Sequence, residues 1–184
     1  NLPVRAFISI NIDPENKENI RKIQHLLKTK VDKPFLVRFE NPKNFHITLF
    51  FIGEIDKRKL ELIYDEMKME LENKYGELNF NCSEINAFPN LDKPRVLFLN
   101  CSSKVNKIFE PAEKIKNILN DFGFTQDKNF HPHITLARIK GKIKLKNLDD
   151  IQTDVNFSAG KISIMESIIT TKGAEHKELF FINL

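Results

Sequence analysis

The sequence predicts an α+β fold of two similar lobes, each with a mainly antiparallel sheet and flanking helices, around a central cleft. The tetrapeptide His-Ile-Thr-Leu occurs twice, beginning at His46 and at His133, and this spacing of 87 residues is close to half of the 184-residue chain. Strand patterns of period two interleave with helical patterns in both halves, which is typical of α+β lobes. Because no low-complexity tract or Gly/Ser linker divides the chain, we expect residues 1–184 to form a single two-lobed domain.

The first half predicts strands that alternate with two helices. Alternating apolar residues predict a strand over residues 4–12, and Asp13 followed by proline is typical of a helix N-cap and first turn. A short strand is expected over residues 35–39 and a longer one over residues 45–52, before Gly53. Asp56 is expected to cap a second helix that Gly76 ends. The inward faces of the two helices are expected to be Ile20, Ile23, Leu27 and Val31 in the first, and Leu60, Ile63, Met67 and Leu71 in the second.

The second half repeats this alternation. Strands are expected over residues 78–82 and 96–99, on either side of a proline-bounded loop over residues 89–94. A strand over residues 133–139 and three β segments within residues 155–184 follow later. Between them, Ser102 or Ser103 is expected to begin a helix that Gly123 ends, with the apolar face Val105, Ile108, Ala112, Ile115, Leu119 and Phe122.

The composition favours a globular cytoplasmic protein with no membrane span. Hydrophobic residues make up 41% of the chain, enough for a packed core, and the net charge of +4 favours a polyanionic partner such as RNA, although a lysine-rich solvated surface has the same charge. No segment approaches the ~18 consecutive apolar residues of a membrane span, and the first residues lack a signal-peptide pattern. Because Cys82 and Cys101 form no C-x-x-C pair, we expect buried, unpaired thiols in a reducing compartment.

Both copies of the tetrapeptide are expected to present their polar side chains together. In a strand, residues two apart share a face, so His46 points with Thr48 and His133 points with Thr135, while Ile and Leu anchor the opposite face. On the first strand, alternation assigns Phe45 and Phe51 to this anchoring face as well.

Two imidazoles and two hydroxyls that converge suit in-line displacement at phosphorus. Imidazole exchanges protons near neutral pH, so one neutral histidine can take the proton of the attacking oxygen while a protonated one supplies the departing oxygen. The threonine hydroxyls can donate hydrogen bonds to the phosphate oxygens. A lone histidine on a strand is more often a packing residue, but two copies in matched settings favour catalysis. The other histidines rate lower: His25 faces solvent, His176 lies near a turn, and Pro132 makes His131 a residue of a bulge or strand start.

These motifs and their flanks resemble the 2H phosphoesterase superfamily, and most closely its RNA 2′,3′-cyclic phosphodiesterase branch, also called 2′-5′ RNA ligase, which has a LigT-like fold. The resemblance runs along the chain through residues 5–8, 44–53, 88–89, 94–97, 131–138, 165–167 and 172–175. It departs at His176, where relatives usually carry Tyr.

The resemblance implies hydrolysis of an RNA terminal 2′,3′-cyclic phosphate to a 2′-phosphate, with no metal or cofactor, and a reverse reaction that forms a 2′-5′ linkage. By position, His46 would give a proton to the departing 3′ oxygen and His133 would accept the proton of the attacking water. Thr48 and Thr135 would bind the phosphate. The partner would be RNA with a cyclic phosphate end, with tRNA halves as one candidate, and the protein is expected to be a monomer.

Several basic residues and three alternatives stay open at this stage. Strict alternation places Arg138 opposite His133, so we favour a structural ion pair for it; Arg5 could approach the cleft, and Lys93 and Arg95 are either RNA contacts or solvated loop residues. A zinc site built on His131-x-His133 is one alternative, but it needs a third ligand from His46, His176 or an aspartate. A non-catalytic module for single-stranded RNA is another. A 2H phosphodiesterase that acts on small cyclic nucleotides is the third.

Overall fold

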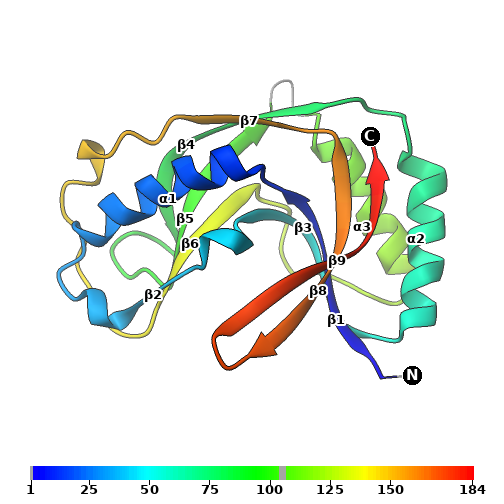
Figure 1. Ribbon diagram of the computed structural model, residues 1–184, viewed down its shortest axis with the longest axis horizontal. Helices are drawn as coiled ribbons and strands as arrows, with labels where there is room; N and C mark the ends of the chain where they lie inside the picture. The colour runs from blue at the N-terminus through cyan, green and yellow to red at the C-terminus, as the bar shows by residue number, and fades with distance from the viewer. Residues whose placement is uncertain (1, 104–106) are drawn as a thin grey trace.

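The computed structural model describes residues 2–103 and 107–184, and its centre is one curled antiparallel sheet (Figure 1). The strands lie across the sheet in the order β7-β4-β5-β6-β3-β1-β8-β9, and β2 pairs with β6 beside this path. Their bounds are β1 Val4–Asn11, β2 Val37–Phe39, β3 His46–Ile55, β4 Leu78–Phe88, β5 Val96–Ser103, β6 His133–Ile139, β7 Val155–Ala159, β8 Lys161–Thr170 and β9 Gly173–Asn183.

The sheet consists of two four-stranded halves that meet at β3 and β6. One half has the order β3-β1-β8-β9 and the other the order β6-β5-β4-β7. Each half contains a strand–helix–strand unit that ends in a His-Ile-Thr-Leu strand: β1, α1 (Pro14–Lys28) and β3 in the first, and β5, α3 (Phe109–Asp121) and β6 in the second. The predicted α+β fold with two related lobes is therefore confirmed.

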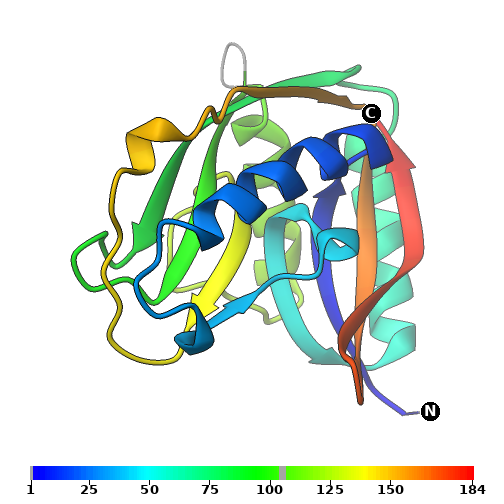
Figure 2. The same ribbon diagram turned by 60° about the vertical axis from the view of Figure 1, so that its left-hand side comes forward.

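The helices connect the two lobes. Helix α1 follows β1 of the first lobe but contacts β7 of the second, whereas α3 belongs to the second lobe and contacts β3 of the first (Figure 2). Helix α2 (Lys57–Leu71) packs beside α3 and against β9. Within residues 2–103 and 107–184, no helix combines the length and apolar character needed to cross a membrane.

The first two helices begin where their caps predict. The Asp13 carboxylate accepts a hydrogen bond from the backbone N–H of Asn16 at 3.1 Å, and Asp56 accepts one from Arg58 at 2.8 Å. Their ends were predicted less well. Helix α1 ends at Lys28, and Val31 forms an isolated β-bridge with Leu145 instead of extending the helical face. Helix α2 ends at Leu71, before Gly76. The predicted strand over residues 35–39 is a 3₁₀ turn followed by the short strand β2.

The predicted start of the third helix at Ser102 or Ser103 is wrong. Both serines belong to β5, where they pair with Asn81 and Phe80 of β4. Helix α3 begins at Phe109, and the predicted helical residue Val105 lies outside the described residues. The end is as expected, because Gly123 follows the helix with a φ of +90°, a left-handed conformation that glycine adopts without a steric penalty.

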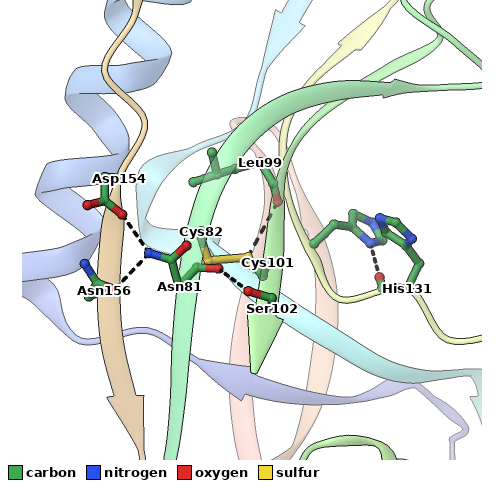
Figure 3. Close-up of a disulfide and its surroundings, with 9 residues drawn as sticks. Asn81, Cys82, Leu99, Cys101, Ser102, His131, Asp154 and Asn156 are labelled. Atoms are coloured by element: carbon green, nitrogen blue, oxygen red, sulfur yellow. Dashed lines mark hydrogen bonds between the residues drawn. A yellow bond between two sulfur atoms is a disulfide. The ribbon is translucent and has the colours of Figure 1, made fainter. Parts of the chain in front are cut away.

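The two cysteines form a disulfide, so the prediction of unpaired thiols is wrong, although both side chains are buried as expected (Figure 3). Cys82 on β4 lies opposite Cys101 on β5, with a Cα–Cα distance of 4.1 Å. Spacing along the chain could not show this cross-strand register. Beside the disulfide, the Asn81 side chain donates hydrogen bonds to Asp154 at 2.6 Å and Asn156 at 2.9 Å, which ties β4 to β7.

Candidate active site

The two tetrapeptides present their polar side chains on one face of the sheet. His46, Thr48, His133 and Thr135 are all partly exposed. The alternate residues are buried in the core, at 0% exposure for Ile47 and Ile134, 3% for Leu49 and 0% for Leu136. The predicted division into an anchoring face and a polar face is therefore confirmed for both motifs.

Strand pairing brings the two motifs together at the centre of the sheet. Ile47 of β3 lies opposite Ile134 of β6 in an antiparallel register. That register places Thr135 beside His46 and His133 beside Thr48, so the two histidines occupy diagonal positions, which lie about 7–8 Å apart in such pairs. The four side chains form a group with approximate two-fold symmetry, which we call the His–Thr quartet. The histidines are thus neighbours on adjoining strands rather than residues of two separate sheets.

Backbone carbonyls fix the orientation of both imidazoles in the same way. Nδ1 of His46 lies 2.6 Å from the carbonyl oxygen of Asn44, and Nδ1 of His133 lies 2.6 Å from that of His131. A carbonyl oxygen only accepts, so each Nδ1 carries the proton and donates, which leaves Nε2 for chemistry. Nε2 of His46 is 2.8 Å from the Thr48 hydroxyl, which donates to it when the ring is neutral.

Asn44 holds the His46 ring in place through its backbone carbonyl. Its side chain is buried, and its Nδ2 donates to the carbonyl oxygen of Ala174 on β9 at 2.8 Å. The His46 ring therefore depends on a contact between two distant segments of the chain. Asn44 is a positioning residue that the sequence alone did not reveal, because the Ala174 contact depends on how β9 is placed.

A cavity of about 630 Å³ lies over this part of the sheet, and His46, Thr48 and Thr135 all line it. His133 is not among the lining residues. Its ring lies against Phe88 and Phe98, with centroid distances of 5.2 Å and 5.1 Å. Three members of the His–Thr quartet thus contact the cavity directly, and the fourth lies next to them on the same face of β6.

Cationic side chains dominate the charge of the cavity. Arg5, Arg38, Arg138 and Lys172 line it, against a single carboxylate from Glu40. The arginines come from β1, β2 and β6, so three separate strands direct guanidinium groups to one site. A guanidinium matches the geometry and charge of a phosphate, and the cavity therefore suits an anionic substrate.

A bulge at the same place in both motifs explains why Arg138 lines the cavity. The register between β6 and β5 shifts at Leu136, which lies between the paired residues Thr135 and Ala137. Leu136 and Ala137 are therefore both buried, and the alternation of buried and exposed side chains reverses before Arg138. Arg138 takes part in no ion pair with any residue that the structure describes. The favoured structural ion pair is therefore wrong.

The equivalent bulge in β3 corrects a second expectation. The register with β1 shifts at Leu49, so Phe50 is buried and Phe51 turns to the cavity with 46% exposure. Phe51 was expected on the anchoring face. The Arg5 guanidinium lies over its ring at 4.9 Å from the centroid, which places Arg5 at the cavity as well.

His176 is a residue of the candidate site that sequence interpretation rated too low. It lies on β9 and lines the cavity, where its ring meets the edge of His46 at a centroid distance of 5.3 Å. Phe7 packs against both rings, at 5.0 Å from His46 and 4.8 Å from His176. The only signal in the sequence was that relatives usually carry an aromatic residue at this position.

The environment lowers the pKa of three histidines at the site, His46, His133 and His176. Burial lowers the pKa of His46 to about 4, against the raising effect of its hydrogen bond to Asn44, and the positive charges of His176, His133 and Lys17 add to the lowering. Burial also lowers the pKa of His133. Its hydrogen bond to the His131 carbonyl raises this pKa, whereas the positive charge of Arg138 lowers it further. Burial lowers the pKa of His176, with a smaller contribution from Lys17. The site is therefore poised to gain protons when an anion binds.

The zinc alternative lacks the ligand it needs. The rings of His131 and His133 lie 5.9 Å apart, and in residues 2–103 and 107–184 no three His, Cys, Asp or Glu side chains are grouped as metal ligands. His46 and His176 instead form a pair on the cavity side.

Known proteins resemble this chain both in sequence and in fold. A family model described as the AKAP7 2′5′ RNA ligase-like domain matches residues 6–172. The chain is 30% identical over 176 residues to the RNA 2′,3′-cyclic phosphodiesterase of Methanocaldococcus jannaschii, covering 92% of this chain and 95% of that protein. It is 27% identical over 181 residues to the protein of the same name from Archaeoglobus fulgidus, covering 96% and 98%. The crystal structure of E. coli LigT in its apo form superposes with a TM-score of 0.80 at 18% identity, over 100% of this chain and 98% of LigT, and so shows the same fold.

Proposed function

The chain belongs to the 2H phosphoesterase family as an AKAP7 2′5′ RNA ligase-like domain, and from this premise we propose that it hydrolyses the 2′,3′-cyclic phosphate at the end of an RNA to a 2′-phosphate. The observation that carries the proposal is the pairing of Ile47 with Ile134, which gathers both His-x-Thr motifs on one face of the sheet. The excess of cations in the cavity supports an anionic substrate, and relatives named RNA 2′,3′-cyclic phosphodiesterase support this chemistry.

In the proposed reaction the two imidazoles act on opposite sides of one phosphorus atom. His133 takes a proton from water as the water oxygen bonds to phosphorus, and the bond from phosphorus to the 3′ oxygen breaks. His46 gives its Nε2 proton to the departing 3′ oxygen, which leaves a 3′-hydroxyl and a 2′-phosphate. The Thr48 and Thr135 hydroxyls donate to the non-bridging oxygens. The ring of a cyclic diester already aligns its leaving oxygen, and its phosphate carries one negative charge, so these groups suffice without a metal.

The low pKa of His46 sets the protonation state from which this reaction starts. A pKa of about 4 keeps most of the free protein neutral at His46 near pH 7, whereas its proposed role requires a proton. A bound phosphate supplies a negative charge within contact distance, which raises the pKa of an imidazole. The substrate therefore brings about the protonation that the reaction needs, and the unliganded protein holds only a small fraction of the active form.

The finer expectations from the sequence belong to the same proposal. We propose that the protein acts as a monomer in the cytoplasm and that its substrates include RNA ends such as those of tRNA halves. We also propose that it forms a 2′-5′ linkage when an RNA 5′-hydroxyl replaces water. A non-catalytic RNA module is the weaker alternative, because both imidazoles are oriented through Nδ1 with Nε2 left available. A small cyclic nucleotide as the only substrate is the remaining rival.

The test is product identification with an RNA that ends in a 2′,3′-cyclic phosphate. Protein dialysed against EDTA is incubated with this RNA in ¹⁸O-water, and ³¹P NMR distinguishes a 2′-phosphate from a 3′-phosphate. We expect a 2′-phosphate that carries one ¹⁸O atom. A 3′-phosphate would reverse the leaving group and contradict the assigned roles. Absence of turnover in the EDTA-treated protein, with turnover restored by zinc, would contradict the metal-free mechanism.

A further inference from the structure

A second cavity, distinct from the one above the His–Thr quartet, carries a strong positive charge. It has a volume of about 580 Å³ and is formed by three loops, around residues 32–33, 92–95 and 141–144. Its charged lining residues comprise five cations and two carboxylates, which are Lys33, Lys93, Arg95, Lys142 and Lys144 against Asp32 and Asp92. The lining therefore has an excess of three positive charges, and nothing in the proposed reaction uses it.

The cations of this cavity are exposed and available. None of the five takes part in an ion pair with a residue in the described part of the chain. One of the two acids is already engaged, because Asp32 accepts a hydrogen bond from the backbone N–H of Lys144 at 2.7 Å. The amide donor is neutral and leaves the charge of Asp32 unchanged, so the lining keeps its excess of three positive charges.

The loops that carry these cations are held in place by backbone hydrogen bonds. The N–H of Asp32 donates to the carbonyl of Lys144 at 3.1 Å, and the N–H of Arg95 donates to that of Phe88 at 2.8 Å. The carbonyl of Arg95 in turn accepts from Ile139 at 2.8 Å. The cavity is thus built before any ligand arrives, which reduces the entropy cost of binding.

Two segments lead directly from the first cavity to the second. Arg138 of β6 lines the first cavity, and Gly141, three residues later and just after the end of β6, lines the second. Along the neighbouring segment, Lys33 lines the second cavity and Arg38 the first. Phe35 lies between these two in the chain, is 79% exposed, and makes no ring contact with the described aromatic residues. Proteins bind single-stranded nucleic acid through positively charged grooves that follow the backbone and aromatic side chains on which bases stack. The cations of the two cavities and the exposed ring of Phe35 match these two features.

We propose that the second cavity binds the phosphodiester backbone of the RNA that precedes the cyclic phosphate end, with Phe35 as a stacking surface for one of its bases. This inference rests on the proposed function and deepens it, because it makes an RNA strand, rather than a cyclic mononucleotide, the preferred substrate. The cations neutralise backbone phosphates without reading sequence, so the site accepts many RNA ends.

The test compares two substrates with the same reacting group. One is an oligoribonucleotide of about eight nucleotides with a 2′,3′-cyclic phosphate end, and the other is the corresponding 2′,3′-cyclic mononucleotide. The double variant K142Q/K144Q removes two cations of the cavity, and K57Q/K68Q removes two exposed lysines from α2 as a matched control. Figure 1 shows α2 at the other end of the molecule from β2 and the loops of the second cavity.

We expect K142Q/K144Q to lower kcat/KM for the RNA by about fivefold for each lysine at 0.1 M salt. Each phosphate contact to a single strand contributes about 0.7 to the slope of log affinity against log salt concentration, which corresponds to about fivefold in affinity at 0.1 M relative to 1 M salt. The same variant should hydrolyse the cyclic mononucleotide at the wild-type rate, and F35A should show the same selectivity. The control K57Q/K68Q should leave both substrates unaffected. An RNA rate equal to wild type in K142Q/K144Q, an equal loss on both substrates, or an equal loss in the control would overturn the proposal.

A binding measurement separates this inference from the proposed reaction. If the wild-type protein hydrolyses neither substrate, the proposed function fails, and fluorescence anisotropy with an RNA ending in a 2′-phosphate then tests the cavity alone. Weaker binding to K142Q/K144Q than to K57Q/K68Q, with a shallower dependence on salt, would support the cavity as an RNA site. Equal binding by both variants would overturn it.

Discussion

Ile47 of β3 lies opposite Ile134 of β6, and this residue pair joins the two halves of the single sheet. Both side chains are at 0% exposure, and each lies between the histidine and the threonine of its own motif. The same pair therefore contributes to the core and sets the spacing of the His–Thr quartet. Stability and activity are coupled at this position.

Replacement of Ile134 by alanine tests that coupling. A buried Ile-to-Ala change costs about 2–5 kcal/mol of unfolding free energy, since it removes apolar contacts and leaves a cavity. We expect urea denaturation of I134A to show a loss in this range, together with reduced kcat in the folded protein. I169A is the matched control, because Ile169 is 76% exposed, and it should change stability by no more than about 0.5 kcal/mol. A stability loss in I134A no larger than that in I169A would show that the pair is not a core contact.

Removal of either histidine of the quartet should lower kcat strongly without loss of the fold. Each proton transfer contributes on the order of 10²- to 10⁴-fold, so H46A and H133A should each lower kcat by that factor. H25A serves as the control, because His25 is exposed on α1 and lies outside the cavity lining. Circular dichroism checks the fold of each variant. Wild-type hydrolysis by H46A or H133A would show that the assigned roles are wrong.

The pH dependence of kcat/KM should be bell-shaped with an optimum below pH 6.5. The active form needs His46 protonated and His133 neutral, and both have a pKa below the ordinary 6.5, about 4 for His46. At low pH both rings are protonated and at high pH both are neutral, so the fraction of protein in the active form falls on both sides of the optimum. A steady-state pH profile with a cyclic mononucleotide checks this, and an optimum above pH 7 would contradict it.

Replacement of His176 by glutamine should raise the pKa of His46. Burial is the largest cause of the low pKa of His46, and the substitution leaves most of this burial in place. The positive charge of His176 also lowers the pKa of His46, and H176Q removes this charge. The acid limb of the kcat/KM profile should therefore move to higher pH, and NMR titration of the His46 ring should show the same shift. H25Q should leave both unchanged. A His46 pKa in H176Q that is equal to or below the wild-type value would show that the contact between these rings carries no charge effect.

Sequence alone predicted the parts of the fold and site that depend on local pattern. Alternation along the two motifs placed His46, Thr48, His133 and Thr135 on one face, because residue parity is a property of each strand by itself. The caps at Asp13 and Asp56 were predicted for the same reason, since an N-cap needs only its own first turn.

The parts that sequence did not predict depend on pairing between distant segments. The bulges at Leu49 and Leu136 reverse the alternation and bring Phe51 and Arg138 to the cavity, and a bulge is defined only against the partner strand. His176 reaches His46 only because β9 returns beside β8. The cross-strand disulfide follows from the register of β4 and β5 in the same way.

The central claim is that the imidazoles of His46 and His133 contact one phosphoryl group. The most direct measurement is ¹⁵N NMR of both rings during titration with a 2′-nucleotide, the product that the proposed reaction forms at the RNA end. We predict that the pKa of both histidines rises with a single saturating event at one nucleotide per chain. A response of only one ring, or two separate binding events, would contradict the claim.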